Sequence, residues 1–323
     1  MKTEPASLQT RIATSMPAKG SPVPASPRAG MGYAARGRPP LKIRVRDTTL
    51  FFDVEGAKLV ADGPRMRERP TLVLLHGGPG FDHSSFKPSF SVLADAAQLV
   101  YLDHRGNGRS ERDSRERWNL ADWADDLRAF CDVLGIERPV VLGQSFGGMV
   151  AMAYGTRHPD HAAGLVLSST TARTRLDRVL DAFERLGGAE AREAARAYWS
   201  DPGKDTLPDY ARLCFPLYQR SPRDPDADRR TEWNFDVMFD FGGGEDRTMN
   251  LLPDLARVRC PTLVMVGEDD PITPPGDAED IAAALPDGLG RLERFPACGH
   301  GVFRDDPKTA FASIRRFIQQ VAG

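Results

Sequence analysis

Residues 139–147 read PVVLGQSFG, a short apolar run that ends in the pattern Gly-x-Ser-x-Gly around Ser145. The run predicts a buried β-strand, and the small and apolar residues that follow at 147–155 predict a helix. A serine at such a strand–turn–helix junction stands exposed at the carboxyl end of a sheet, and the flanking glycines leave room for the tight turn. The stretch therefore predicts an α/β fold with Ser145 as a nucleophile.

Other short apolar runs, each closed by glycine or a polar turn, surround this junction. Continuous rather than alternating hydrophobicity is typical of strands buried on both faces of a parallel sheet. Residues 120–134 have apolar side chains at helical spacing, and Asp306-Pro307 predicts the start of a helix reaching Val321. We expect a doubly wound, mostly parallel sheet that opens with an antiparallel hairpin from residue 41 and continues with strands at 71–75, 98–102, 139–142, 163–167, 261–266 and 291–295.

One long stretch interrupts the alternation of strands and helices. Residues 172–250 lack strand signals and contain 13 basic and 16 acidic residues in largely helical text. An insertion between two strands of an open α/β sheet lies over the carboxyl ends of the strands, where such sheets bind ligands. We predict a helical cap at 172–250 on a core formed by 41–171 and 251–323.

The amino-terminal segment has a different composition. Residues 1–40 contain seven prolines and six basic residues against a single acid, Glu4. Such a segment buries too little apolar surface to offset the entropy of ordering it. We expect a disordered tail, with Met31 as an alternative start of translation and an organellar transit peptide as a further interpretation.

Composition limits the possible partners. The 323 residues carry a formal net charge of −2, which argues against nucleic acid or an anionic membrane as the partner. No apolar stretch is long enough for a membrane span. The four cysteines are scattered, without metal-site spacing or a secretion signal, and so predict a cytoplasmic protein: Cys131, Cys214, Cys260 and Cys298. We expect its partner to be a small-molecule or short-peptide substrate. The oligomeric state is left open.

A serine hydroxyl needs a base, and that base needs a carboxylate to orient it. His300 lies in a glycine-flanked loop directly after the strand at 291–295 and is the candidate base. The strand at 261–266 ends in an acidic turn, from which we choose Asp270 as the third member, with Asp269 as second choice. The predicted triad is Ser145, Asp270 and His300.

A run of glycines follows the strand at 71–75. Free backbone N–H groups in such a loop can stabilise a developing oxyanion. We assign this oxyanion hole to the N–H groups of Phe146 and Gly78, with Gly77 as the alternative to Gly78. His76 is expected to hold the loop rather than to act as a base.

These motifs together resemble the α/β-hydrolase superfamily, and most closely its proline iminopeptidase and amino-acid amidase branch. The resemblance rests on HGGPG at 76–80, on the loop at 103–110 and on the order Ser145, Asp270, His300, and it covers about residues 41–321. It implies a helical cap and hydrolysis through an acyl-enzyme, with no metal and no organic cofactor.

The resemblance also implies a substrate, namely a small amide or a peptide amino terminus. Glutamates of the cap would then hold the free amino group, and we nominate Glu232 or Glu245. The aromatic cap residues Trp199, Trp233, Phe235 and Phe239 would line an apolar pocket. The branch commonly has Trp and Gln where this chain has Phe146 and His104, which keeps a carboxylesterase or lactonase as the alternative. A non-catalytic ligand-binding protein is a third hypothesis.

Overall fold

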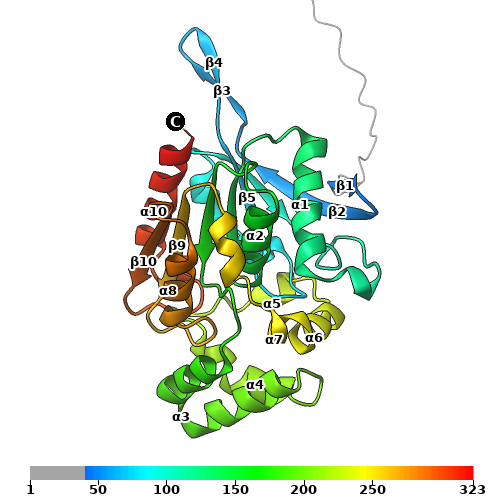
Figure 1. The fold of residues 1–323 in the computed structure, drawn as a ribbon, viewed down its shortest axis with the longest axis vertical. Helices are drawn as coiled ribbons and strands as arrows, with labels where there is room; N and C mark the ends of the chain where they lie inside the picture. Colours follow the sequence, from blue (N-terminus) through cyan, green and yellow to red (C-terminus); the bar gives the residue numbers. More distant parts are fainter. Residues whose placement is uncertain (1–40, 323) are drawn as a thin grey trace, which may run out of the picture. The chain divides into compact units, whose positions relative to one another are not determined.

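The computed structural model describes residues 41–322, so the predicted tail at 1–40 lies outside the described residues. A central eight-stranded sheet has the order β1-β2-β6-β5-β7-β8-β9-β10. Figure 1 shows β1 and β2 at one side of this sheet and β9 and β10 at the other. β1 and β2 form an antiparallel hairpin, β2 pairs antiparallel with β6, and all remaining neighbours are parallel. The strands are β1 (Lys42–Val45), β2 (Thr48–Glu55), β5 (Thr71–Leu75), β6 (Gln98–Leu102), β7 (Val140–Gln144), β8 (Gly164–Ser168), β9 (Thr262–Gly267) and β10 (Gly290–Phe295).

Helices cover both faces of this sheet, as the doubly wound prediction requires. Successive residues of a strand point to opposite faces, so Val73 and Leu75 of β5 pack into one apolar cluster and Leu72 and Leu74 into another. The first cluster contains residues of α1 (Leu120–Leu134), α2 (Phe146–Arg157) and α8 (Pro275–Ala284). The second contains residues of α9 (Val302–Asp305), α10 (Pro307–Val321) and the 3-10 turns His83–Phe86 and Ser89–Leu93. Further 3-10 turns span Arg115–Arg117 and Leu252–Arg257.

The predicted elements agree closely with the observed ones. The strands expected at 71–75 and 98–102 and the helices expected at 120–134 and 307–321 coincide with β5, β6, α1 and α10. The other four expected strands differ from the observed ones by one or two residues at an end. A separate two-stranded hairpin, β3 (Leu59–Asp62) and β4 (Arg65–Glu68), was not expected, because most of its side chains are exposed and show no apolar alternation.

Residues 172–250, all of which the structure describes, contain helices and no strand. They include α3 (Leu176–Ser200), α4 (Leu207–Leu213), the 3-10 turn Phe215–Leu217, α5 (Ala227–Arg230), α6 (Phe235–Gly243) and α7 (Glu245–Thr248). α3 and α4 pack around their own apolar cluster, which includes Phe183 and Tyr210. Figure 1 shows the cap helices α3 and α4 gathered beyond one end of the sheet. Within residues 41–322, no helix combines the length and the apolar character needed to cross a membrane.

Candidate active site

Ser145 occupies a strained turn between the end of β7 and the start of α2. Its φ of 56° and ψ of −120° lie in a region that residues with a side chain rarely adopt. A Cβ at Gly143 would lie 2.1 Å from the carbonyl oxygen of Gly147, and a Cβ at Gly147 would lie 2.1 Å from that of Leu75. Both flanking positions therefore require glycine, because the turn packs directly against its own backbone and that of β5.

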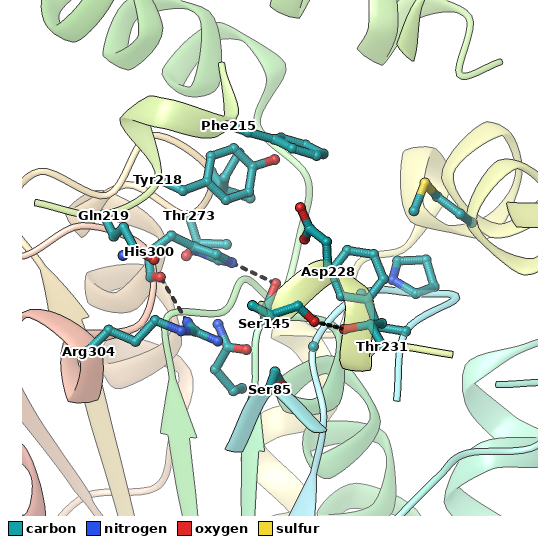
Figure 2. A pocket seen from close by; sticks show the side chains of 18 of the residues that line it. Ser85, Ser145, Phe215, Tyr218, Gln219, Asp228, Thr231, Thr273, His300 and Arg304 are labelled. Carbon is teal, nitrogen blue, oxygen red and sulfur yellow. Dashed lines mark hydrogen bonds between the residues drawn. The ribbon is translucent and has the colours of Figure 1, made fainter. Parts of the chain in front are cut away.

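Three side chains predicted to act together form a hydrogen-bonded chain. Ser145 Oγ lies 2.9 Å from His300 Nε2 (Figure 2). On the other side of the ring, His300 Nδ1 lies 3.0 Å from Asp270 Oδ2. Asp270 is fully buried and accepts three further hydrogen bonds of 2.9 Å, from the N–H groups of Ile272 and Thr273 and from the Thr273 hydroxyl. These donors fix the carboxylate toward the imidazole.

The neighbouring acid, Asp269, points elsewhere. Its carboxylate oxygens lie 3.1 Å from an Arg185 nitrogen and 3.3 Å from an Arg220 nitrogen, at the partly exposed surface between the acidic turn and the cap. Of the two acids considered from sequence, Asp270 is the one that the structure brings to His300.

The histidine loop is tied to the cap by backbone hydrogen bonds. The N–H of His300 donates to the carbonyl of Tyr218 at 2.5 Å, and the Tyr218 ring stands edge-on to the imidazole. Asp305 Oδ1 accepts from the N–H groups of Arg220 and Ser221 at 3.0 and 2.7 Å. The cap segment 218–221 therefore forms part of the frame that holds His300.

The glycine loop after β5 faces the same site. Gly78, at φ 123°, lines the cavity beside Ser145, and the Phe146 N–H is one of those at the start of α2 without an intrahelical acceptor. His76 lies beneath the loop, with Nδ1 2.7 Å from the Gly77 carbonyl oxygen and Nε2 accepting from the N–H of His104 at 3.3 Å. Burial lowers the pKa of both histidines, so His76 is a neutral support for the loop.

Ser145 and His300 open onto a cavity of about 470 Å³ between the sheet and the cap. Phe146 and His104 are absent from its wall. The Phe146 ring is buried against Trp123 and the cap residue Phe241, and the His104 ring packs against Phe146. Most of the aromatic part of the wall comes from the cap, while Phe81 and Phe303 come from the core; the cap residues include Trp199, Tyr210, Phe215, Tyr218 and Trp233.

Two of the predicted aromatic lining residues lie outside this cavity. Phe235 and Phe239 occupy adjacent turns on one face of α6, where Phe235 is 42% exposed and stacks on Trp233 from outside. Met238 and Phe241, on a neighbouring face of α6, do line the wall. The prediction is therefore wrong for Phe235 and Phe239, while Trp199 and Trp233 do line the cavity.

The two glutamates nominated for binding an amine also point away. The Glu232 side chain is 58% exposed and approaches Arg109 over a separate shallow recess. Glu245 accepts a hydrogen bond of 2.9 Å from the N–H of Leu120 and so caps the start of α1. The structure corrects this prediction: the cap carboxylates that line the cavity are Asp224, Asp228 and Asp246, and of these Asp246, next to Glu245, is the one without an arginine partner among the described residues.

Asp246 is buried with little compensation for its charge. Thr174 donates a hydrogen bond to it at 3.1 Å, and among the described residues no cation lies within ion-pair distance. Burial, reinforced by the neighbouring Glu245 carboxylate, raises the pKa of Asp246 to about 7. No sequence motif marks Asp246, nor Arg304, a cation of the same wall, since both reach the cavity only through tertiary packing.

The site combines a parallel sheet with a serine at a strand–turn–helix junction and a histidine after the last strand, as in α/β hydrolases. The chain belongs to the α/β hydrolase fold family, whose sequence profile matches residues 70–307.

Two proteins of similar sequence and one crystal structure of similar fold carry the names of hydrolases. A proline iminopeptidase from Lactiplantibacillus plantarum is 28% identical over 278 residues, covering 79% of this chain and 94% of that protein. The provisionally named carbamate hydrolase RutD of Caulobacter sp. (strain K31) is 28% identical over 271 residues, covering 82% and 96%. The crystal structure of proline iminopeptidase from Mycobacterium smegmatis superposes with a TM-score of 0.67 at 22% identity, covering 88% and 98%. The relatives support hydrolase activity without agreeing on a substrate.

Proposed function

We propose that this protein is a serine hydrolase that works through an acyl-enzyme on Ser145. The observation that carries the proposal is the hydrogen-bonded chain from Ser145 through His300 to Asp270, open to a cavity roofed by the cap. Nucleophile, base and orienting carboxylate within hydrogen-bond reach are what acyl transfer needs.

In the proposed reaction, His300 Nε2 takes the proton of Ser145 Oγ as the oxygen attacks the substrate carbonyl. The N–H groups of Phe146 and Gly78, or of Gly77 in place of Gly78, donate to the resulting oxyanion. The carbonyl carbon then releases its leaving group, which takes the proton from His300. Water, activated by the same histidine, hydrolyses the acyl-enzyme and restores Ser145.

The substrate we propose is a small amide or peptide with a free amino terminus. An ammonium group enters a cavity of this kind only when it is paired. Asp246 supports this assignment, because it is a buried carboxylate of the wall whose single side-chain hydrogen bond leaves its charge available to a bound cation. The apolar part of the wall, including Trp199 and Trp233, would receive the rest of the acyl group.

A small-molecule ester or lactone is the second candidate. With a pKa of about 7, Asp246 is partly protonated near neutral pH, and in that state the aromatic wall suits an uncharged acyl group. Solved structures of similar fold include an Exiguobacterium antarcticum esterase, with a TM-score of 0.63 at 19% identity.

A fluorophosphonate probe followed by peptide mapping tests the serine without knowledge of the substrate. We expect a single adduct on Ser145, and none on the Ser145→Ala variant. Labelling elsewhere, or no labelling, would favour the non-catalytic ligand-binding hypothesis.

Three substrates then separate the two candidates: a prolyl arylamide, its N-acetylated form and a short-chain nitrophenyl ester. An aminopeptidase cleaves the first and rejects the second, because acetylation removes the charge that Asp246 would bind. Equal rates on both amides, or activity on the ester alone, would select the esterase.

A further inference from the structure

Arg304 is a cation on the cavity wall that has no anionic partner within the protein. Among the described residues, no carboxylate lies within ion-pair distance of its guanidinium. Its polar contact is a long hydrogen bond of 3.4 Å from Nη1 to the carbonyl oxygen of His300. The other arginine and lysine side chains of the wall are all paired: Lys87 with Glu55, Arg175 with Asp177, Arg223 with Asp228 and Arg230 with Asp224.

The nearest acid in sequence, Asp305, does not neutralise Arg304. Its Oδ1 accepts from the backbone of Arg220 and Ser221, and its Oδ2 accepts from the N–H of Gly299 at 2.8 Å. The carboxylate is thus engaged in holding the cap segment to the histidine loop. Burial lowers the pKa of Arg304 to about 10, so the side chain remains charged at neutral pH while lacking a counter-ion.

The surroundings of the guanidinium keep it in place with its donors available. Its carbon lies 4.4 Å from the centre of the Phe303 ring, which supports one face. A Cβ at Gly301 would lie 2.2 Å from Arg304 Nη1, so this glycine leaves the space that the guanidinium occupies. A planar guanidinium with free N–H groups matches the geometry of a carboxylate.

The position of Arg304 selects one side of the substrate. Figure 2 shows Arg304 on the same side of Ser145 as His300, with Asp228 and Thr231 on the other side. In acyl transfer the leaving group departs next to the histidine that protonates it. A group contacting both His300 and the cavity therefore faces the leaving group.

We propose that Arg304 binds a carboxylate carried by the leaving group, so that the preferred substrates release an acid such as an amino acid or a hydroxy acid. This inference rests on the proposed serine hydrolase function. It adds to that function a selectivity on the leaving-group side, opposite the part of the wall that would receive the acyl group.

A pair of prolyl aryl esters tests the inference, because they share the acyl group of the proposed substrate and differ only in the leaving group. One is the prolyl ester of 3-hydroxybenzoate and the other is that of 3-hydroxybenzamide, whose leaving group is uncharged. We compare kcat/KM for both in wild type, Arg304→Gln, Arg304→Lys and Arg175→Gln. The last variant is the matched control, since it removes a positive charge of the same wall that is already paired with Asp177.

We expect wild type to prefer the carboxylate substrate, and Arg304→Gln to reduce that preference about 10- to 100-fold, the range for a hydrogen bond to a charged group. Arg304→Lys should restore part of the preference, and Arg175→Gln should leave it unchanged. The rate on the 3-hydroxybenzamide ester should stay near wild type in every variant.

Two results would overturn the inference. An unchanged preference in Arg304→Gln would mean that the guanidinium does not meet the leaving group. An equal loss on both substrates would mean that Arg304 only supports the His300 loop. Failure of the proposed function is distinguishable from both, because Ser145→Ala would then hydrolyse the two esters at the wild-type rate.

Discussion

Two buried carboxylates differ in how far the protein compensates their charge: Asp270, which lies behind His300 at the end of the sheet, and Asp246, which lines the cavity from the cap. Asp270 accepts hydrogen bonds from Ile272 and from Thr273 and also contacts His300. Asp246 receives one side-chain hydrogen bond, from Thr174. The sheet side is thus electrostatically complete, whereas the cap side leaves a charge for a group that the protein does not contain.

The most severe way to break the complete side is to remove its nucleophile. In Ser145→Ala we expect kcat to fall about 10,000- to 1,000,000-fold with the fold retained, because the remaining rate comes only from binding and the oxyanion hole. Steady-state kinetics and circular dichroism check both halves of the expectation. Wild-type turnover by the alanine variant on every substrate would remove Ser145 from its role.

The next largest effect should come from the orienting carboxylate. Asp270→Asn is expected to lower kcat about 1,000- to 10,000-fold, because an amide no longer holds the imidazole in the required tautomer. Asp269→Asn is the matched control in the same turn and should stay near wild type, since Asp269 faces Arg185 and Arg220. The reverse pattern would transfer the role to Asp269.

On the cap side, where Asp246 has no counter-ion, we expect a substitution to change substrate binding rather than the chemical step. Asp246→Asn should raise KM for a prolyl arylamide about 10- to 100-fold and leave an uncharged ester unaffected. In wild type, KM for the free-amine substrate should fall as pH rises through about 7, because the carboxylate must ionise to bind an ammonium. Glu232→Gln, the control at the exposed acid, should change neither value.

Asp246 should also affect the free energy of unfolding: ionisation of its carboxylate favours binding of an ammonium group but destabilises the folded state. Because burial raises the pKa of Asp246, the unfolded chain loses this proton at lower pH than the folded one. The stabilisation is complete below the ordinary aspartate pKa and is lost as pH rises to about 7. We expect the stability of Asp246→Asn relative to wild type to grow by about 2 kcal/mol between pH 5 and pH 8, measured by urea unfolding. An advantage independent of pH would place the charged form in a better environment than the structure indicates.

The contrast between the two sides also explains what could be predicted from sequence. Ser145, His300 and the acidic turn each follow a buried strand, and parallel strands bring their carboxyl ends to one edge. Their meeting therefore follows from local patterns. Choosing Asp270 over Asp269 depended on turn geometry, which left both open until the structure was known.

The cap depended on packing that no local pattern specifies. Phe235, Met238, Phe239 and Phe241 are all apolar, so composition does not tell which face of α6 turns inward. The two acids Glu245 and Asp246 are adjacent, yet one caps α1 and the other faces the cavity. Arg304 lies in a short helix after His300, and its lack of a counter-ion emerges only from where Asp305 points.

The bond between Tyr218 and His300 matters for anyone who would rebuild this protein. The carbonyl oxygen that accepts this hydrogen bond belongs to the inserted segment, while the N–H that donates it belongs to the α/β core. Exchanging 172–250 as a cassette would consequently remove a support of the base together with the substrate walls. A workable chimaera would retain residues 218–221 and exchange the helices on either side, so that the substrate walls change while the support of His300 stays the same.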